Sequence, residues 1–415
     1  METNREGAVT GQEDQITATL EGLVETGEIA GAVALTSRHG APVRSVAAGW
    51  RDIAAGEPMT RDTIMRIASM SKPITSVAAL MLFDEGRFAL DDPISQWAPE
   101  FARMRVLNNP EGALDDTVAA EREITFMDLL THRAGLTYGA FHAGPLAEAY
   151  ATTLGMDLDS HLTPDNWIAG LASLPLIDQP GAGFHYGSST DLLGFVIARI
   201  AGMDLGELLA ERIFLPLGMS DTGFTVPAAK RNRRALMYGF DTDGRLEVRS
   251  AHPLAFLAER PEHLSFVSGG AGLWSTADDY LKFARMFVND GAVDGVRLLK
   301  LETLRRMTAN YLTAQQAAAA RIMGMPVFSG QGFGLGVAVV TDPDKATAIR
   351  CKGGIGTVGW PGAYGGWWQA DPTDGTVLIF LAQNALDMGR AAGGAGLGVY
   401  VAISEFHSLA STTGR

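Results

Sequence analysis

The longest apolar stretch of the chain has the residue spacing of a buried helix. Between residues 69 and 86, apolar side chains recur every three or four positions, and most positions between them are also apolar. The residues with helical spacing are Met70, Ile74, Val77 and Met81. Pro73 is compatible with a first helical turn, and Gly86 is a typical C-terminal stop. A helix that is apolar on nearly every side is buried.

Before this stretch, the chain alternates between helical and strand-like patterns. Residues 15–26 place apolar side chains on one side of an amphipathic helix. Apolar runs over residues 30–37 and 43–49 are joined by the turn-forming residues 39–42, which predicts a β-hairpin. Up to residue 90, the expected order is therefore helix, strand, strand, helix.

The pattern of apolar and polar residues changes after residue 90, where helical patches alternate with long irregular connections and strand patterns are few. The patches cover residues 125–132, 162–172 and 189–201. Strand patterns return over residues 334–340, 347–352, 364–370 and 376–382, and a last helix is expected over residues 399–409.

The simplest assembly lets the N-terminal hairpin and the late strands share one antiparallel sheet, with the first and last helices packed on it. This predicts an α+β fold, an antiparallel sheet flanked by helices plus a mostly helical domain. Residues 1–90 and 262–415 form a discontinuous α/β domain in this prediction, and residues 91–261 form the helical one.

Composition narrows the range of partners. The chain has 415 residues, of which 47% are hydrophobic and 19% charged, as expected for a globular protein. A net charge of −14 argues against nucleic acid or an anionic membrane as partner. The single cysteine, Cys351, cannot form an internal disulfide, and the first 21 residues contain no apolar run typical of a secretory signal. We therefore expect a cytoplasmic protein that does not enter a membrane.

Ser69 and Lys72 are the first candidates for chemistry. On a helix, positions i and i+3 share a face, so the lysine amine can activate the serine hydroxyl as a nucleophile. Of the six lysines in the chain, only Lys72 has a serine three residues before it. The simpler alternative is that Ser69 caps the helix and Lys72 points to solvent.

Two further motifs contain residues suited to a catalytic cleft. Tyr186 precedes an apolar helix, and its phenol can relay a proton; the alternative is a packed tyrosine, with Ser188 or Ser189 as helix cap. Residues 353–364 are rich in glycine and formally match a dinucleotide-binding motif, but they do not join a strand to a helix. A strand edge that lines a cleft explains these glycines better.

Taken together, these motifs resemble those of the serine β-lactamase and penicillin-binding protein superfamily. The motifs are Ser69-x-x-Lys72, Tyr186-x-Ser188 and Trp360-Pro361-Gly362. Residues 131–136 and 269–279 are similar to two further landmarks of its class C branch. Penicillin-recognising members have a cationic residue in the third motif, whereas tryptophan followed by a small residue and glycine is similar to the family VIII carboxylesterases.

The resemblance implies a β-lactamase-like fold and a serine hydrolase that cleaves esters of short to medium acyl chains. It implies that Lys72 and Tyr186 share the Ser69 proton, and that the N–H groups of Ser69 and Ala363 form an oxyanion hole. The residues that it places at the substrate are Tyr138, Trp360, Gly362 and Ser188. No metal or cofactor is expected, the only partner expected is a small-molecule ester, and the oligomeric state stays open.

Several alternatives remain open at this point. A β-lactamase, a D-Ala-D-Ala peptidase, an amide hydrolase or an acyltransferase could use the same scaffold. An α/β-hydrolase lacks support because no Gly-x-Ser-x-Gly occurs, and a zinc hydrolase because the eight histidines include no His-x-x-x-His pair. A non-catalytic binding or scaffold protein is the alternative of a different class.

Overall fold

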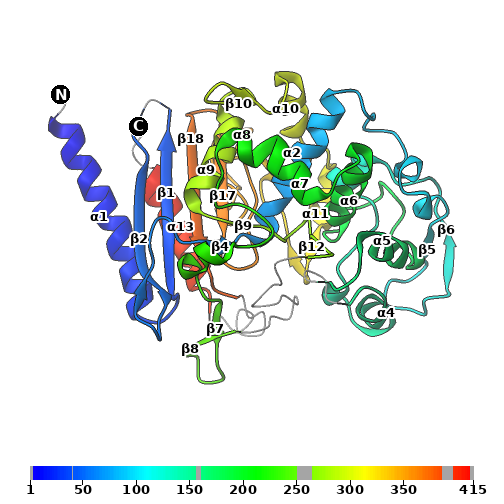
Figure 1. The fold of residues 1–415 in the computed structure, drawn as a ribbon, viewed down its shortest axis with the longest axis horizontal. Helices are drawn as coiled ribbons and strands as arrows, with labels where there is room; N and C mark the ends of the chain where they lie inside the picture. Colours follow the sequence, from blue (N-terminus) through cyan, green and yellow to red (C-terminus); the bar gives the residue numbers. More distant parts are fainter. Residues whose placement is uncertain (1–2, 40, 156–159, 250–263, 386–395, 412–415) are drawn as a thin grey trace.

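The computed structural model describes residues 3–39, 41–155, 160–249, 264–385 and 396–411. Within these ranges, eight strands form a central antiparallel sheet in the order β14-β15-β16-β17-β18-β1-β2-β3 (Figure 1). The strands are β1 Gly31–Arg38, β2 Arg44–Asp52, β3 Glu57–Pro58, β14 Gln331–Phe333, β15 Ala338–Val340, β16 Val358–Gly359, β17 Trp367–Asp371 and β18 Thr376–Ala382. Strand β1 pairs with both β2 and β18, which confirms that the N-terminal hairpin and the late strands share one sheet.

Helices cover both faces of this sheet because side chains alternate along its strands. On one face, Ala32 and Ala34 of β1 pack with helix α1, Thr3–Glu25, and helix α13, Gly398–Ser411. On the other face, Val33 and Leu35 belong to the large core that contains helix α2, Ser71–Asp84, and helix α9, Ala277–Ala284. Figure 1 shows α1 and α13 at the outer side of the sheet, and most other helices beyond its opposite face.

Helix α2 is the buried helix that the apolar spacing predicts. All its residues from Ser71 to Leu82 are buried, and Gly86 ends it with a φ of 71°. It packs against helix α6. The other helices are α3 Phe126–Leu130, α4 Gly144–Leu154, α5 Pro164–Ser173, α6 Ser189–Ala201, α7 Leu205–Leu209, α8 Leu215–Leu217, α10 Leu301–Met307 and α11 Ala314–Ala319.

The remaining strands form short two-stranded pairs. Strand β4, Met65–Arg66, pairs with β9, Trp274–Ser275, directly before the Ser69 turn. The other pairs are β5 Arg105–Leu107 with β6 Thr117–Ala119, β7 Tyr238–Phe240 with β8 Leu246–Val248, β10 Ala292–Val293 with β11 Val296–Arg297, and β12 Arg321–Ile322 with β13 Met325–Pro326. The two-domain division stays a prediction, and its boundary at residues 261 and 262 lies outside the described residues.

The strand predicted over residues 347–352 is wrong. The backbone of this segment bonds to side-chain amides and not to a neighbouring strand: Gln331 Nε2 donates to the Cys351 carbonyl at 2.8 Å, and Gln369 Oε1 accepts from the Lys352 N–H at 2.9 Å. Local apolar composition cannot reveal these partners, because they lie about 20 residues away along the chain. The segment predicted over residues 334–340 forms a strand only from Ala338.

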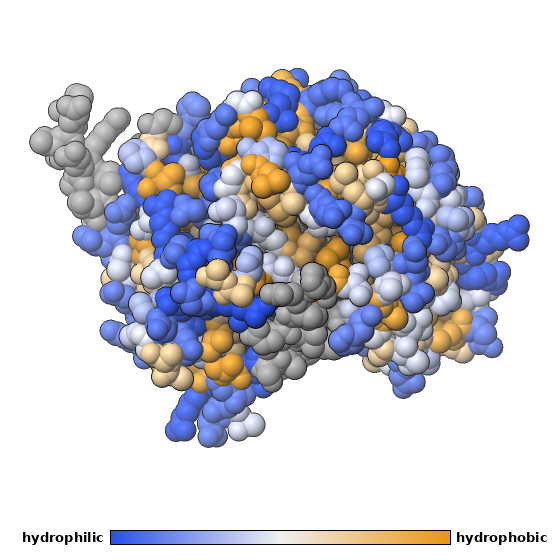
Figure 2. Space-filling model, in the orientation of Figure 1, coloured by the Kyte–Doolittle hydropathy of each residue, from blue (hydrophilic) through white to orange (hydrophobic). Residues whose placement is uncertain are grey.

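The molecule presents a mostly polar face to solvent. The face shown in Figure 2 is largely hydrophilic, with hydrophobic residues gathered mainly in patches near its centre. In the part of the chain that the structure describes, no helix combines the length and the apolar character needed to cross a bilayer.

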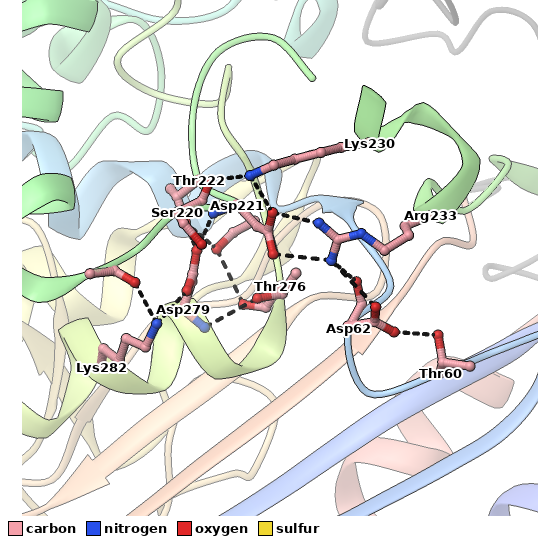
Figure 3. Close-up of polar contacts among 12 residues, drawn as sticks. Thr60, Asp62, Ser220, Asp221, Thr222, Lys230, Arg233, Thr276, Asp279 and Lys282 are labelled. Atoms are coloured by element: carbon pink, nitrogen blue, oxygen red, sulfur yellow. Dashed lines mark hydrogen bonds and ion pairs between the residues drawn. The ribbon is translucent and has the colours of Figure 1, made fainter. Parts of the chain in front are cut away.

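An ionic network fixes the segment that leads into β4 (Figure 3). Arg233 donates to both carboxylate oxygens of Asp221, at 2.6 and 3.0 Å, and to the backbone carbonyl of Asp62 at 2.9 Å. Lys230 adds an ion pair to Asp221 at 2.8 Å, and the Asp221 N–H donates to Asp279 of α9 at 2.7 Å. The network therefore holds the chain before β4 against the helix that follows β9.

Replacing Asp221 with asparagine is expected to lower the free energy of unfolding by about 1–3 kcal/mol at pH 7. Burial raises the pKa of Asp221, but Arg233 and Lys230 outweigh it, so this pKa lies below its ordinary value. The stabilisation is therefore complete above the unfolded-state pKa of about 4 and is lost as the pH falls through the folded-state pKa.

Urea unfolding of wild type and Asp221→Asn across this pH range measures the effect. Asp294→Asn is the matched control, because it removes an exposed ion pair with Arg285 and should cost less than about 0.5 kcal/mol. A stability difference between wild type and Asp221→Asn that does not shrink on acidification contradicts the prediction.

Candidate active site

Ser69 lies on a strained turn between β4 and α2. Residues Ala68–Met70 form a single 3₁₀ turn, and α2 begins two residues after the serine. Ala68 is fully buried with a φ of 44°, a conformation that costs a non-glycine residue free energy and persists only where its surroundings impose it. Ile67 supplies that restraint, because its N–H donates to the Leu273 carbonyl at 3.0 Å.

Lys72 is fully buried, so the alternative in which it points to solvent is wrong. Its Nζ donates to three oxygens: the Gly270 carbonyl at 2.9 Å, Tyr138 Oη at 3.2 Å and Ser69 Oγ at 3.4 Å. A buried ammonium needs such partners, because an unpaired charge is costly away from water. The bonds thereby fix the amine beside the serine hydroxyl.

Asp191 is a buried acid next to this amine that the sequence motifs did not single out. It lies in the first turn of α6, and its carboxylate accepts from Tyr138 Oη at 3.2 Å, from the Gly270 N–H at 3.0 Å and from the Ser268 hydroxyl. Burial raises the pKa of Asp191, although the charge of Lys72 opposes the shift. The signal available in the sequence is an acid that opens an otherwise apolar helix five residues after Tyr186.

Tyr186 reaches the same centre from the turn before α6. The Lys72 amine lies 4.6 Å from the centroid of the Tyr186 ring, which is favourable for a cation over an aromatic face. The Tyr186 hydroxyl accepts a hydrogen bond from Trp360 Nε1 at 3.0 Å. The second and third motifs are therefore in direct contact, although 174 residues separate them.

Trp360-Pro361-Gly362 follows strand β16 and starts the connection to β17, so the strand expected from residue 364 begins only at Trp367. The Gly362 N–H donates to the Gly366 carbonyl at 2.6 Å and closes a tight loop. Trp360 itself is buried, with an exposed fraction of 1%.

The two glycines of this loop let it approach the Ser69 turn. A Cβ on Gly362 would lie 2.5 Å from the Ile67 carbonyl oxygen, and one on Gly366 would lie 2.7 Å from Met70 Sδ. No larger residue fits either position without a shift. The loop therefore carries Ala363 close to the turn, and no backbone hydrogen-bond partner of the Ala363 N–H occurs among the described residues.

Ser188 and Tyr138 differ in what they offer a substrate. The Ser188 hydroxyl donates to the Thr137 carbonyl at 3.1 Å, a bond that ties the start of α6 to a segment 51 residues earlier. Gly187 is needed here, since a Cβ would lie 2.3 Å from the Thr137 backbone. Tyr138 contacts both Lys72 and Asp191 and thus belongs to the charged centre.

His132 borders the site without bonding to it. Both ring nitrogens are buried and have no hydrogen-bond partner within the described part of the chain. The ring centroid lies 4.9 Å from that of Tyr186. Burial, with help from the charge of Lys72, holds the pKa of His132 well below its ordinary value, so this histidine is neutral. It adds an uncharged wall to the site.

A serine hydroxyl beside a buried amine, next to an antiparallel sheet with helices on both faces, is typical of a serine hydrolase of the β-lactamase fold. Comparison with known proteins bears this out. The beta-lactamase family matches residues 16–400, and the chain belongs to that family.

Individual relatives agree with the family. The chain is 44% identical to Protein Rv1367c of Mycobacterium tuberculosis strain H37Rv, over 89% of this chain and 90% of that protein. It is 32% identical to Esterase EstB of Burkholderia gladioli, over 86% and 87%. The solved structure of EstCE1, "a hydrolase with promiscuous acyltransferase activity", matches with a TM-score of 0.76 at 27% identity, over 95% and 99%. The resemblance to family VIII esterases is thus confirmed.

Replacing Asp191 with asparagine is expected to destabilise the fold by roughly 3 kcal/mol, because the buried ammonium of Lys72 loses its acidic neighbour. Turnover of p-nitrophenyl butyrate should fall at least about tenfold in kcat, as misplacing the amine weakens serine activation. Asp165→Asn is the control, since that carboxylate is exposed. If Asp191→Asn kept the wild-type kcat and stability, Asp191 would have no role in stabilising or positioning the Lys72 amine.

Proposed function

We propose that this protein is a serine carboxylesterase that works through a Ser69 acyl-enzyme. The observation that carries the proposal is the contact between the fully buried Lys72 amine and Ser69 Oγ at 3.4 Å. A hydroxyl becomes a useful nucleophile only when a base removes its proton, and no other side chain is hydrogen-bonded to this hydroxyl among the described residues.

The proposed reaction has two halves. One deprotonated member of the Lys72–Tyr186 pair accepts the single Ser69 proton while Oγ attacks the ester carbonyl, and the N–H groups of Ser69 and Ala363 hold the oxyanion. The C–O bond to the alcohol then breaks, and the alcohol leaves with a proton relayed through Tyr186. Water attacks the acyl-enzyme in the second half, releases the carboxylic acid and returns the proton to Ser69.

The surroundings of the centre support an apolar acyl group. Phe141 stacks with the Tyr186 ring at 6.3 Å between centroids and is only partly buried, so part of it stays accessible. Phe184 and Phe333 continue the aromatic cluster around Trp360. Such a wall favours hydrocarbon over a peptide backbone. We propose Tyr138, Trp360, Gly362 and Ser188 as the substrate-binding residues.

Ester chemistry fits the third motif better than β-lactam chemistry. Trp360 stands where penicillin-recognising relatives have a cation, and its Nε1 is already used to orient the Tyr186 hydroxyl. We therefore expect faster turnover of p-nitrophenyl butyrate than of a chromogenic cephalosporin. Because EstCE1 is described as having acyltransferase activity besides hydrolysis, the assay is best run with and without an added alcohol.

Ser69→Ala is expected to abolish ester hydrolysis, because Lys72 then has no hydroxyl to activate. Ser71→Ala is the matched control. The Ser71 hydroxyl is fully buried and accepts from the Leu273 N–H at 3.2 Å, so it is not available to a substrate. Its loss should therefore leave substantial activity. Hydrolysis of p-nitrophenyl butyrate and labelling by a fluorophosphonate measure the outcome. Loss of activity in Ser71→Ala alone would show that the wrong serine was chosen.

Tyr186→Phe is expected to lower kcat by roughly a hundredfold, the usual scale for a lost acid–base group. The phenyl ring keeps its packing against Lys72, so stability should change little. Trp360→Phe is a useful comparison, because it removes the hydrogen bond to the Tyr186 hydroxyl and part of the buried indole ring but keeps the phenol itself, so it should lower kcat less. A Tyr186→Phe enzyme with wild-type kcat would remove this phenol from the mechanism.

A further inference from the structure

Arg350 lies beside the site on the connection between β15 and β16. Its guanidinium carbon is 5.1 Å from the centroid of the Trp360 ring. Trp360 in turn donates to the Tyr186 hydroxyl, so one indole ring separates the cation from the acid–base tyrosine. The arginine is partly buried and thus held in place, while some of its surface stays accessible.

The guanidinium has no acidic partner among the described residues. Its Nε donates to the Val327 carbonyl at 3.3 Å, and no bond of its two terminal nitrogens occurs there. Burial lowers the pKa of Arg350, and the groups that face it are the phenols of Tyr400 and Tyr186 and the thiol of Cys351. A guanidinium away from bulk water is stabilised by an anion, and burial raises the pKa values of Tyr400 and Cys351, which keeps both groups neutral.

An arginine without an acidic partner in the described part of the structure is unusual in a chain with 47 acidic and 33 basic residues. Arg199, for comparison, pairs with both Glu100 and Asp165. Stacking on Trp360 explains the orientation of Arg350 but leaves the donors of its terminal nitrogens unused. Two parallel N–H groups match the two oxygens of a carboxylate.

We propose that Arg350 binds a carboxylate group of the ester substrate, which makes it a specificity residue beside the apolar acyl wall. The proposal rests on the esterase function proposed above. The substrate class is then a half-ester of a dicarboxylic acid, or an ester whose alcohol carries a carboxylate. The positive charge that penicillin-recognising relatives carry in the third motif is, in this proposal, supplied from the connection between β15 and β16.

Three esters test the proposal with the intact protein. They are p-nitrophenyl butyrate, which is neutral, the mono-p-nitrophenyl ester of glutaric acid, which carries its carboxylate on the acyl side, and the butyrate ester of 4-hydroxybenzoic acid, which carries it on the alcohol side. We expect Arg350→Gln to lower kcat/KM roughly ten- to a hundredfold for one of the two anionic esters. For the neutral ester, the change should stay within about threefold.

Arg305→Gln is the matched control, because it removes the same charge from an exposed position on α10. It should leave all three esters within about threefold of wild type. Arg350→Lys should keep only part of the preference for the anionic ester, since it keeps the charge but loses the two parallel N–H groups. If both anionic esters change no more than the neutral one in Arg350→Gln, the proposal is overturned.

A salt series on wild type gives a result that does not depend on whether Arg350→Gln folds. Raising sodium chloride should lower kcat/KM for the preferred anionic ester and leave the neutral one unchanged. The overall charge of −14 repels anions. If no local cation attracted the anionic ester, salt would screen this repulsion and raise its kcat/KM. A wild-type enzyme that hydrolyses none of the three esters refutes the esterase function itself; one that hydrolyses them without these differences refutes only the role of Arg350.

Discussion

The buried ammonium of Lys72 is the constraint on which the rest of the site depends. A lysine without exposed surface needs its donors satisfied, and the fold supplies a carbonyl, a phenol and the Ser69 hydroxyl. Asp191 holds two of these neighbours, because it accepts from Tyr138 and from the Gly270 N–H. The same hydrogen bonds that stabilise the charge therefore also position the amine beside the Ser69 hydroxyl.

Close backbone packing provides the second half of the centre. The turn before Ser69 is held in a costly conformation at Ala68, and the loop after β16 reaches it only because Gly362 and Gly366 have no side chains. The ionic network around Asp221 fixes the chain on the other side of β4. The strained backbone at Ala68 is thus held in place by the packing of the neighbouring loop and by the ionic network before β4.

The aromatic cluster links this centre to Arg350. Trp360 contributes a hydrogen bond to Tyr186 on one side and a face for Arg350 on the other. Under the proposed function, the indole of the third motif orients the acid–base tyrosine, and the positive charge lies on Arg350 instead of within the motif. This is consistent with an enzyme that shares the scaffold of β-lactam hydrolases but acts on other acyl compounds.

The sequence by itself determined which segments are apolar enough to be buried. The helical spacing of residues 70–81 and the apolar runs of β1 and β18 are visible in it, and short motifs marked Ser69, Lys72 and Tyr186. Tertiary structure alone decided what depends on distant partners: residues 347–352 are no strand because Gln331 and Gln369 occupy their backbone. Asp191 and Arg350 likewise acquire significance only from burial beside Lys72 and Trp360, because a charged residue in a sequence carries no sign of which neighbour folding will give it.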